Sequence, residues 1–139
     1  MSLQIAMLLE TEEGFAVKVL HVDDENDIRE IVALALEMDG DWEVATATSG
    51  AEALDLMASD RPEIILLDVM MPSMSGPELK KQMDCDPDLR GIPVIFMTAA
   101  AQEQTRAELL ALNALGVIEK PFDPMALGAN LNAMLGSRR

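Results

Sequence analysis

The sequence predicts an α/β domain built on a doubly wound, five-stranded parallel sheet with helices on both faces. Two observations lead to this fold class. From residue 16 onward, short β-branched segments alternate with longer segments whose apolar residues recur at helical spacing, and this pair of elements occurs five times. Because every connection between strands contains a helix, the strands are expected to be parallel. The 139 residues, 50% of them hydrophobic, suffice for one such domain and its core.

Five short runs of β-branched and aliphatic residues predict the strands. The run at 64–67, Ile-Ile-Leu-Leu, is continuously apolar, as expected of a strand that is covered on both faces. The run at 93–97 has the same character, so these two strands are expected in the middle of the sheet. The predicted strands are residues 17–22, 42–47, 64–67, 93–97 and 117–118.

Capping and helix-breaking residues mark the helices between the strands. Gly40 ends the first helix, and Ser49 precedes Glu52 in a capping-box pattern. The predicted helices are 27–38, a segment from Ser49 past Met57, 76–83 after Ser75, 102–113, and a last helix that starts at Asp123-Pro124 and runs to Leu135. Their apolar faces include Ile28, Ile31, Val32, Ala35 and Met38 in the first helix and Leu109, Leu110 and Leu112 in the fourth.

The chain is expected to contain one domain with short extensions. Residues 16–136 form the domain, residues 1–15 a leader and residues 137–139 a tail. The leader carries Leu3, Ile5, Leu8 and Leu9, which could dock against the domain, although fraying is the expectation. Only about four residues follow the last predicted helix, so a protein that acts alone by docking onto partners is predicted over a fragment of a longer protein.

Composition limits the partners and the location. The formal net charge is -15, and so acidic a surface repels phosphate backbones, which argues against direct binding of nucleic acid. The single cysteine, Cys85, excludes an internal disulfide. No apolar run approaches the length of a membrane span, and the N-terminus does not resemble a secretory signal. A cytoplasmic protein without membrane contact is therefore expected.

Chemically useful side chains stand at four of the five strand ends. Asp23 and Asp24 follow the first strand, Asp68 the third, Thr98 the fourth and Lys120 the fifth. In a parallel doubly wound sheet, the carboxyl ends of the strands form the binding edge. Converging carboxylates need a cation, and oxygen-only ligands suit Mg2+. A carboxylate there can attack phosphorus and form an aspartyl phosphate, with the threonine hydroxyl and the ammonium group on the phosphoryl oxygens.

Each of these residues also has a simpler explanation when taken alone. The pair Asp23-Asp24 fits a helix N-cap and its neighbour, Asp68 fits a turn, and Lys120 fits a solvated loop. The only histidine, His21, lies within the first strand and is expected to be a packed or sheet-edge side chain rather than a phosphoryl donor. The combination of all the acids, the threonine and the lysine at one sheet edge is what indicates a site.

The motifs resemble the receiver domain of two-component response regulators from about Lys18 to Leu135. They are Val22-Asp23-Asp24-Glu25, Leu66-Leu67-Asp68-Val69-Met70-Met71-Pro72 with Gly76, Met97-Thr98-Ala99, and Lys120-Pro121-Phe122. The resemblance implies a flavodoxin-like strand order 2-1-3-4-5.

The same resemblance implies a role for each site residue. Asp68 accepts a phosphoryl group from the phosphohistidine of a sensor histidine kinase or histidine phosphotransfer protein. Asp23, Asp24 and Asp68 hold Mg2+ with the backbone carbonyl of Met70, while Thr98 and Lys120 bind phosphoryl oxygens. The fourth helix, fifth strand and fifth helix form the surface for a downstream protein. The chain is then a phosphoacceptor that catalyses only its own phosphorylation and dephosphorylation, not an enzyme.

Val117 and Met70 are expected to affect switching and dephosphorylation, and two other functions compete with the phosphoacceptor role. Many receivers carry an aromatic residue three positions before the lysine, where this chain has Val117, so switching is expected to run through loop and helix movement. Met70 offers no good hydrogen bond to an attacking water, which predicts slow hydrolysis of the aspartyl phosphate. An Asp-nucleophile phosphatase is disfavoured because Asp68-Val69-Met70 lacks a second acid. A phosphorylation-independent adaptor is disfavoured because it would need none of the site residues.

Overall fold

The computed structural model describes residues 16–100 and 102–136. The predicted leader at 1–15 and tail at 137–139 lie outside the described residues. One sheet of five parallel strands has the order β2-β1-β3-β4-β5, which confirms the predicted fold class and the strand order that the resemblance implies. The strands are β1 (Val17–Val22), β2 (Trp42–Ala47), β3 (Ile64–Asp68), β4 (Val94–Thr98) and β5 (Gly116–Glu119).

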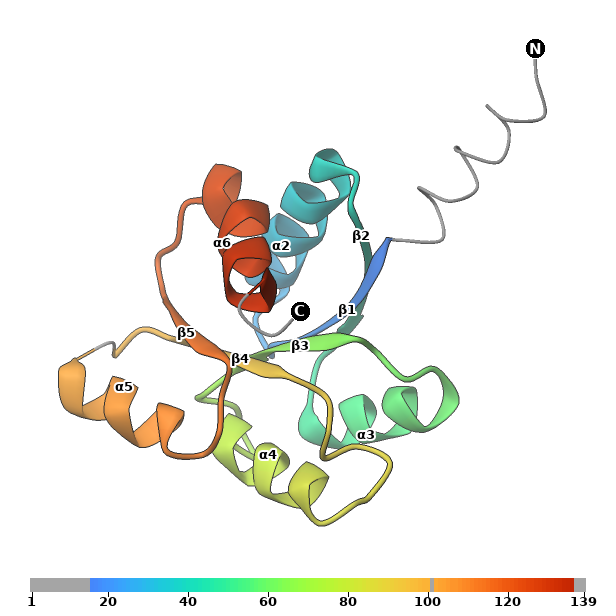
Figure 1. The fold of residues 1–139 in the computed structure, drawn as a ribbon, viewed down its shortest axis with the longest axis vertical. Coiled ribbons are helices and arrows are strands. Elements are labelled where there is room, and N and C mark those ends of the chain that lie inside the picture. The colour runs from blue at the N-terminus through green and yellow to red at the C-terminus, as the bar shows by residue number, and fades with distance from the viewer. Residues whose placement is uncertain (1–15, 101, 137–139) are drawn as a thin grey trace.

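Helices cover both faces of this sheet. Figure 1 shows α2 and α6 on one face and α3, α4 and α5 on the other. The described helices are α2 (Asn26–Asp39), α3 (Gly50–Ser59), α4 (Gly76–Asp84), α5 (Glu103–Leu110) and α6 (Pro124–Gly136). Every connection between strands contains a helix, so the carboxyl ends of all five strands lie at one edge of the sheet.

The predicted capping residues begin and end these helices. The Ser49 hydroxyl accepts the Glu52 backbone N–H, and Ser75 forms a complete capping box with Glu78. Gly40 adopts the left-handed conformation (φ 83°) at the end of α2, which glycine reaches without a steric penalty. These local signals correctly predicted the end of α2 and the starts of α3 and α4.

The fourth predicted helix, 102–113, is too long. α5 ends at Leu110, because the next turn tightens: the backbone N–H of Leu112 donates to Leu109 and that of Asn113 to Leu110. Asn113 then takes a left-handed conformation (φ 65°) that leads the chain toward β5. The predicted apolar face is partly wrong as well, since Leu109 is buried but Leu110 is 43% exposed.

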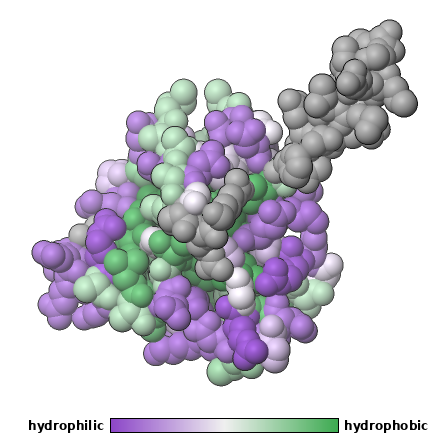
Figure 2. Space-filling view, in the orientation of Figure 1, coloured by the Kyte–Doolittle hydropathy of each residue, from purple (hydrophilic) through white to green (hydrophobic). Residues whose placement is uncertain are grey.

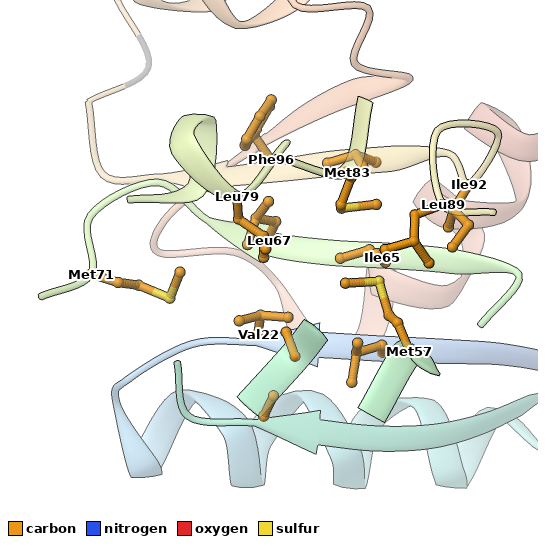
Figure 3. Close-up of a cluster of buried hydrophobic side chains, with 14 of the residues drawn as sticks. Val22, Met57, Ile65, Leu67, Met71, Leu79, Met83, Leu89, Ile92 and Phe96 are labelled. Carbon is orange, nitrogen blue, oxygen red and sulfur yellow. The ribbon is translucent and has the colours of Figure 1, made fainter. Parts of the chain in front are cut away.

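The core consists of two apolar clusters, one on each face of the sheet. Figure 3 shows the cluster beneath α3 and α4, where Leu67 and Phe96 from the strands meet Met57, Leu79 and Met83 from the helices. The second cluster packs the opposite side chains of the strands against α2 and α6. Every residue of β3 and β4 is buried, as predicted for the middle strands. This packing on both faces fixes the strand ends that carry the site.

Apolar surface remains along α2 and α6. Ile31 and Met38, predicted within the apolar face of the first helix, are 40% and 69% exposed, whereas Val32 is fully buried. The apolar stripe of α2 is thus wider than the part that the sheet covers. A groove of about 440 Å³ is lined by these two side chains, Ile31 and Met38, together with Leu34 and Met125. Figure 2 shows pale green residues over α2 and α6. No helix in the described part of the chain combines the length and apolarity needed to cross a membrane.

Candidate functional site

Four of the predicted residues come together at the carboxyl edge of the sheet. Asp23 follows β1, Asp68 and Thr98 are the last residues of β3 and β4, and Lys120 follows β5. The register aligns Asp68 with Met97 and Thr98 with Glu119. The Lys120 backbone N–H donates to the Thr98 carbonyl oxygen at 2.8 Å, so the lysine continues the strand pairing into the site.

The ammonium group of Lys120 joins acids from distant parts of the chain. Its Nζ donates to Asp23 Oδ2 at 2.9 Å and to Asp68 Oδ1 at 3.0 Å, and it lies 3.7 Å from Glu25 Oε1. The side chains of Asp23 and Asp68 are buried, and only 11% of the Lys120 side chain is exposed. These are charge-assisted bonds in a site that little water reaches, where electrostatic interactions are strong.

The residues present fit a divalent cation. Carboxylate oxygens of Asp23, Glu25 and Asp68 all lie within 4.8 Å of one another. Such an oxygen-only group suits Mg2+, which takes a few carboxylates and keeps other positions for water or phosphate. The prediction missed Glu25, whose signal was its place directly after Asp24. Asp24 itself is exposed and stands outside this group, so its assignment and that of the Met70 carbonyl as metal ligands stay predictions.

The two buried acids respond differently to this environment. Burial raises the pKa of Asp68 to about 6; the Lys120 ammonium opposes the rise, and the charges of Asp23 and Asp24 add to it. Burial also acts to raise the pKa of Asp23, but His21, the Glu25 backbone N–H and Lys120 together hold it below its usual value. Asp23 is therefore the acid that this environment keeps ionised, and Asp68 is the acid that burial makes easier to protonate.

Backbone contacts hold Asp23 in place. The Glu25 backbone N–H donates to Asp23 Oδ1 at 2.9 Å, and Arg29 Nη1 donates to the Asp23 carbonyl oxygen at 2.7 Å. Arg29 lies in the second turn of α2, so it ties the start of that helix to the loop that carries the acids. Arg29 was not predicted as a site residue, because an arginine on a helix is usually exposed to solvent.

Thr98 and Gly76 shape the other side of the site. Thr98 is buried, and its Oγ1 accepts the Ala100 backbone N–H at 3.0 Å, which leaves the hydroxyl proton for donation. Gly76 donates its N–H to the Val69 carbonyl oxygen, and a Cβ there would lie 2.4 Å from the Asp68 carbonyl oxygen. The loop after Asp68 can therefore close this tightly only with glycine at position 76.

Fold and site together define a flavodoxin-like, doubly wound domain with an acidic, lysine-bridged pocket at the carboxyl edge of its sheet. The family model described as response regulator receiver domain matches residues 19–132. The chain belongs to the response regulator receiver domain family.

Curated relatives from bacteria agree with this assignment. The chain is 40% identical over 117 residues to the phosphate regulon transcriptional regulatory protein PhoB of Pseudomonas aeruginosa, covering 84% of this chain and 51% of that protein. It is 42% identical over 118 residues to the response regulator SaeR of Staphylococcus epidermidis, covering 84% and 49%. The chain thus spans about half the length of these relatives. PhoB is named a transcriptional regulatory protein, and the absence of direct nucleic-acid binding expected for this chain stays a prediction.

Solved structures show the same architecture. The chemotaxis response regulator CheY4 of Vibrio cholerae superposes with a TM-score of 0.78 at 35% identity, covering 85% of this chain and 98% of that one. The receiver domain of the Francisella response regulator 1452 superposes with a TM-score of 0.79 at 27% identity, covering 88% and 99%. Both solved structures therefore match this chain over nearly their whole length.

Proposed function

We propose that this receiver domain accepts a phosphoryl group on Asp68 and signals by the resulting change in conformation. One observation carries the proposal above the others: Lys120 reaches across the sheet edge to within 3.0 Å of Asp68 and 2.9 Å of Asp23. An acceptor carboxylate, a second acid and a fixed positive charge then stand in one buried pocket. This arrangement supplies the groups that phosphoryl transfer to a carboxylate requires.

The chemistry follows from these side chains. A carboxylate oxygen of Asp68 forms the O–P bond while the P–N bond of a donor phosphohistidine breaks, and the donor nitrogen leaves with the electron pair. Because the pKa of Asp68 is about 6, the carboxylate is mainly ionised near neutral pH and can act as the nucleophile. Lys120 and the Thr98 hydroxyl would bind the oxygens of the acquired group, as the family resemblance suggests.

Magnesium belongs to the same proposal. Asp23 and Asp68 would hold the ion together with Glu25, and Asp24 and the Met70 carbonyl are the further ligands that the family resemblance suggests. When bound, Mg2+ supplies positive charge for the phosphoryl oxygens. The grouping of carboxylate oxygens from Asp23, Glu25 and Asp68 within 4.8 Å of one another supports this assignment, because the single ammonium of Lys120 faces all of them.

Membership of the family suggests the partners of this domain. The phosphoryl donor is a sensor histidine kinase or a histidine phosphotransfer protein, and the face formed by α5, β5 and α6 is the surface offered to a downstream protein. Val117 in β5 is buried against the core and packs as an ordinary strand residue. The chain acts in this proposal as a phosphoacceptor in the cytoplasm rather than as an enzyme with turnover.

Intact-mass measurement after incubation with acetyl phosphate and Mg2+ tests the proposal. The wild type should gain the mass of one phosphoryl group, Asp68→Asn should gain none, and a chelator should abolish the gain. Asp84→Asn is the matched control, since it removes an acid paired with the other buried lysine, Lys80. Equal modification of the wild type and Asp68→Asn would misplace the acceptor, and no modification at all would favour a phosphorylation-independent adaptor.

A further inference from the structure

His21 is a polar side chain in an apolar place. It lies in β1, beside Thr46 of β2 and Leu66 of β3, and its side chain has no exposed surface. Strand alternation puts it on the same face as Val19, whose neighbours are the apolar residues beneath α2 and α6. Neither ring nitrogen has a hydrogen-bond partner among the described residues. A buried polar group without a partner destabilises a fold, so an imidazole here calls for a compensating role.

Asp23 is the acid that His21 approaches. The His21 Nε2 lies 3.6 Å from Asp23 Oδ2, which is slightly too long for a hydrogen bond. The same oxygen accepts the Lys120 ammonium at 2.9 Å, while Oδ1 accepts the Glu25 backbone N–H at 2.9 Å. The imidazole therefore borders the carboxylate on its buried side, and a small movement of Asp23 would bring Oδ2 into hydrogen-bond range of Nε2.

We propose that His21 is a positioning residue for Asp23: its Nε2–H faces Oδ2 and fixes the orientation in which this carboxylate is presented to a divalent cation. The inference rests on the proposed function, because it assumes that Asp23 helps to hold Mg2+. Metal-binding carboxylates are usually oriented by such outer hydrogen-bond partners, and losing one weakens metal binding by roughly 10–100-fold.

A purely structural histidine would behave differently from a positioning one. His21→Leu fills the same space without unsatisfied nitrogens, so the variant should be at least as stable as the wild type. If His21 positions Asp23, the same substitution should weaken Mg2+ binding by about tenfold. Stability and affinity then change in opposite directions, which loss of packing alone cannot produce.

Two amide substitutions locate the nitrogen that matters. His21→Gln places an amide N–H near the position of Nε2 and should retain most of the Mg2+ affinity. His21→Asn places its amide near Nδ1, short of Asp23, and should bind Mg2+ as weakly as His21→Leu. Val19→Ala is the control, since it removes packing from the same face of β1 without touching Asp23 and should lower the melting temperature but leave Mg2+ affinity unchanged.

The experiment titrates the full chain and its variants with MgCl2, following backbone amide NMR signals of residues 23–25, with thermal unfolding measured in parallel. Wild-type affinity in His21→Leu, or equal rescue by His21→Asn and His21→Gln, would overturn the role of His21 and leave the proposed function intact. Loss of affinity in Val19→Ala in step with its stability would also overturn it. A wild type that binds no Mg2+ would remove the metal site and the role of His21 together.

Discussion

Two lysine ammonium groups in this domain are almost enclosed, but their surroundings differ. Lys80, only 4% exposed, pairs at 2.6 Å with Asp84, four residues later on the same helix. Lys120 pairs with Asp23 and Asp68, which are 97 and 52 residues away in the sequence. The Asp84 side chain is 45% exposed, whereas those of Asp23 and Asp68 are buried.

The difference separates a structural pair from a functional site. The Lys80 pair is neutral and local, and its acid can turn to water if the lysine is lost. Lys120 stands among Asp23, Glu25 and Asp68, so one positive charge faces several negative charges. Burial raises the pKa of Asp68 to about 6, and the neighbouring acids add to this rise. Only the Lys120 group has a deficit of positive charge that a metal ion can fill.

The largest expected effect comes from removing each lysine in turn. Lys120→Met leaves two buried acids without their cation and should lower the free energy of unfolding at pH 8 by about 3–5 kcal/mol. Lys80→Met frees an acid that reaches solvent and should cost at most about 1 kcal/mol. Denaturant unfolding measures both, and Mg2+ should restore part of the loss only in Lys120→Met. Equal losses of unfolding free energy in the two variants would contradict the assignment of Lys80 to a structural pair and Lys120 to a functional site.

Asp68→Asn should stabilise the protein at pH 8. A folded-state pKa near 6, against the ordinary value of 3.8 for an aspartate, means that the native state binds this proton more tightly than the unfolded chain does. The stabilisation that comes from protonated Asp68 in the folded state is complete below pH 3.8 and is lost as the pH rises through 6. Neutral Asn avoids the loss, so we expect a gain of about 2 kcal/mol at pH 8 that shrinks at pH 5.

Unfolding curves of the wild type and Asp68→Asn at pH 5 and pH 8, without Mg2+, check this prediction. Asp84→Asn is the control and should show no such gain at pH 8, because its carboxylate is half exposed beside Lys80. A destabilised Asp68→Asn at pH 8 would mean that Lys120 fully compensates the charge of Asp68, contrary to the comparison above.

Glycine substitutions near each lysine extend the comparison to the backbone. Gly76→Ala places a Cβ 2.4 Å from the Asp68 carbonyl oxygen and should cost about 1–2 kcal/mol of stability. At Gly91, in the pocket that Lys80 also lines, the nearest atom to such a Cβ is 3.5 Å away, so Gly91→Ala should be nearly neutral. Thermal unfolding of the two variants measures the difference. Matching melting temperatures would show that the loop after Asp68 can move to accommodate the added methyl group.

The smallest expected effect concerns the open side of the Lys120 site. Met70 is 78% exposed, two residues after Asp68, and has no group that orients water. Met70→Asn adds a donor and an acceptor and should speed loss of the phosphoryl group by about three- to tenfold. The decay of the phosphorylated mass after removal of acetyl phosphate measures it. Rapid decay that is the same in both proteins would remove Met70 as a determinant of this rate.

The sequence predicted the fold and the meeting of Lys120 with Asp68 because both follow from local signals and the geometry of parallel sheets. The carboxyl ends of parallel strands lie at one edge of the sheet. Residues that directly follow the apolar strand segments are therefore close to one another in the fold. Gly40, Ser49 and Ser75 predicted helix boundaries from local signals too, because each caps a helix through contacts within a few residues.

What the sequence left open depends on side-chain direction. Asp24 and Glu25 are adjacent acids, and only the start of α2 decides that the Glu25 carboxylate reaches the Lys120 group. Leu110 fits the helical stripe, but α5 stops there and turns it outward. His21 is packed, as expected for a residue within the first strand, but the approach of its Nε2 to Asp23 was not predicted, because it depends on where the two side chains point.

Trp42, the only tryptophan of the chain, opens β2 at the edge of the sheet opposite the acids. It is 5% exposed, and its Nε1 donates to Asp39 at 2.7 Å where α6 approaches through Gly128. The protein thus carries one intrinsic fluorophore at the junction of α2, β2 and α6. Its emission should follow global unfolding in a single signal, and phosphorylation should alter it only if the movement extends through α6 to the far edge of the sheet.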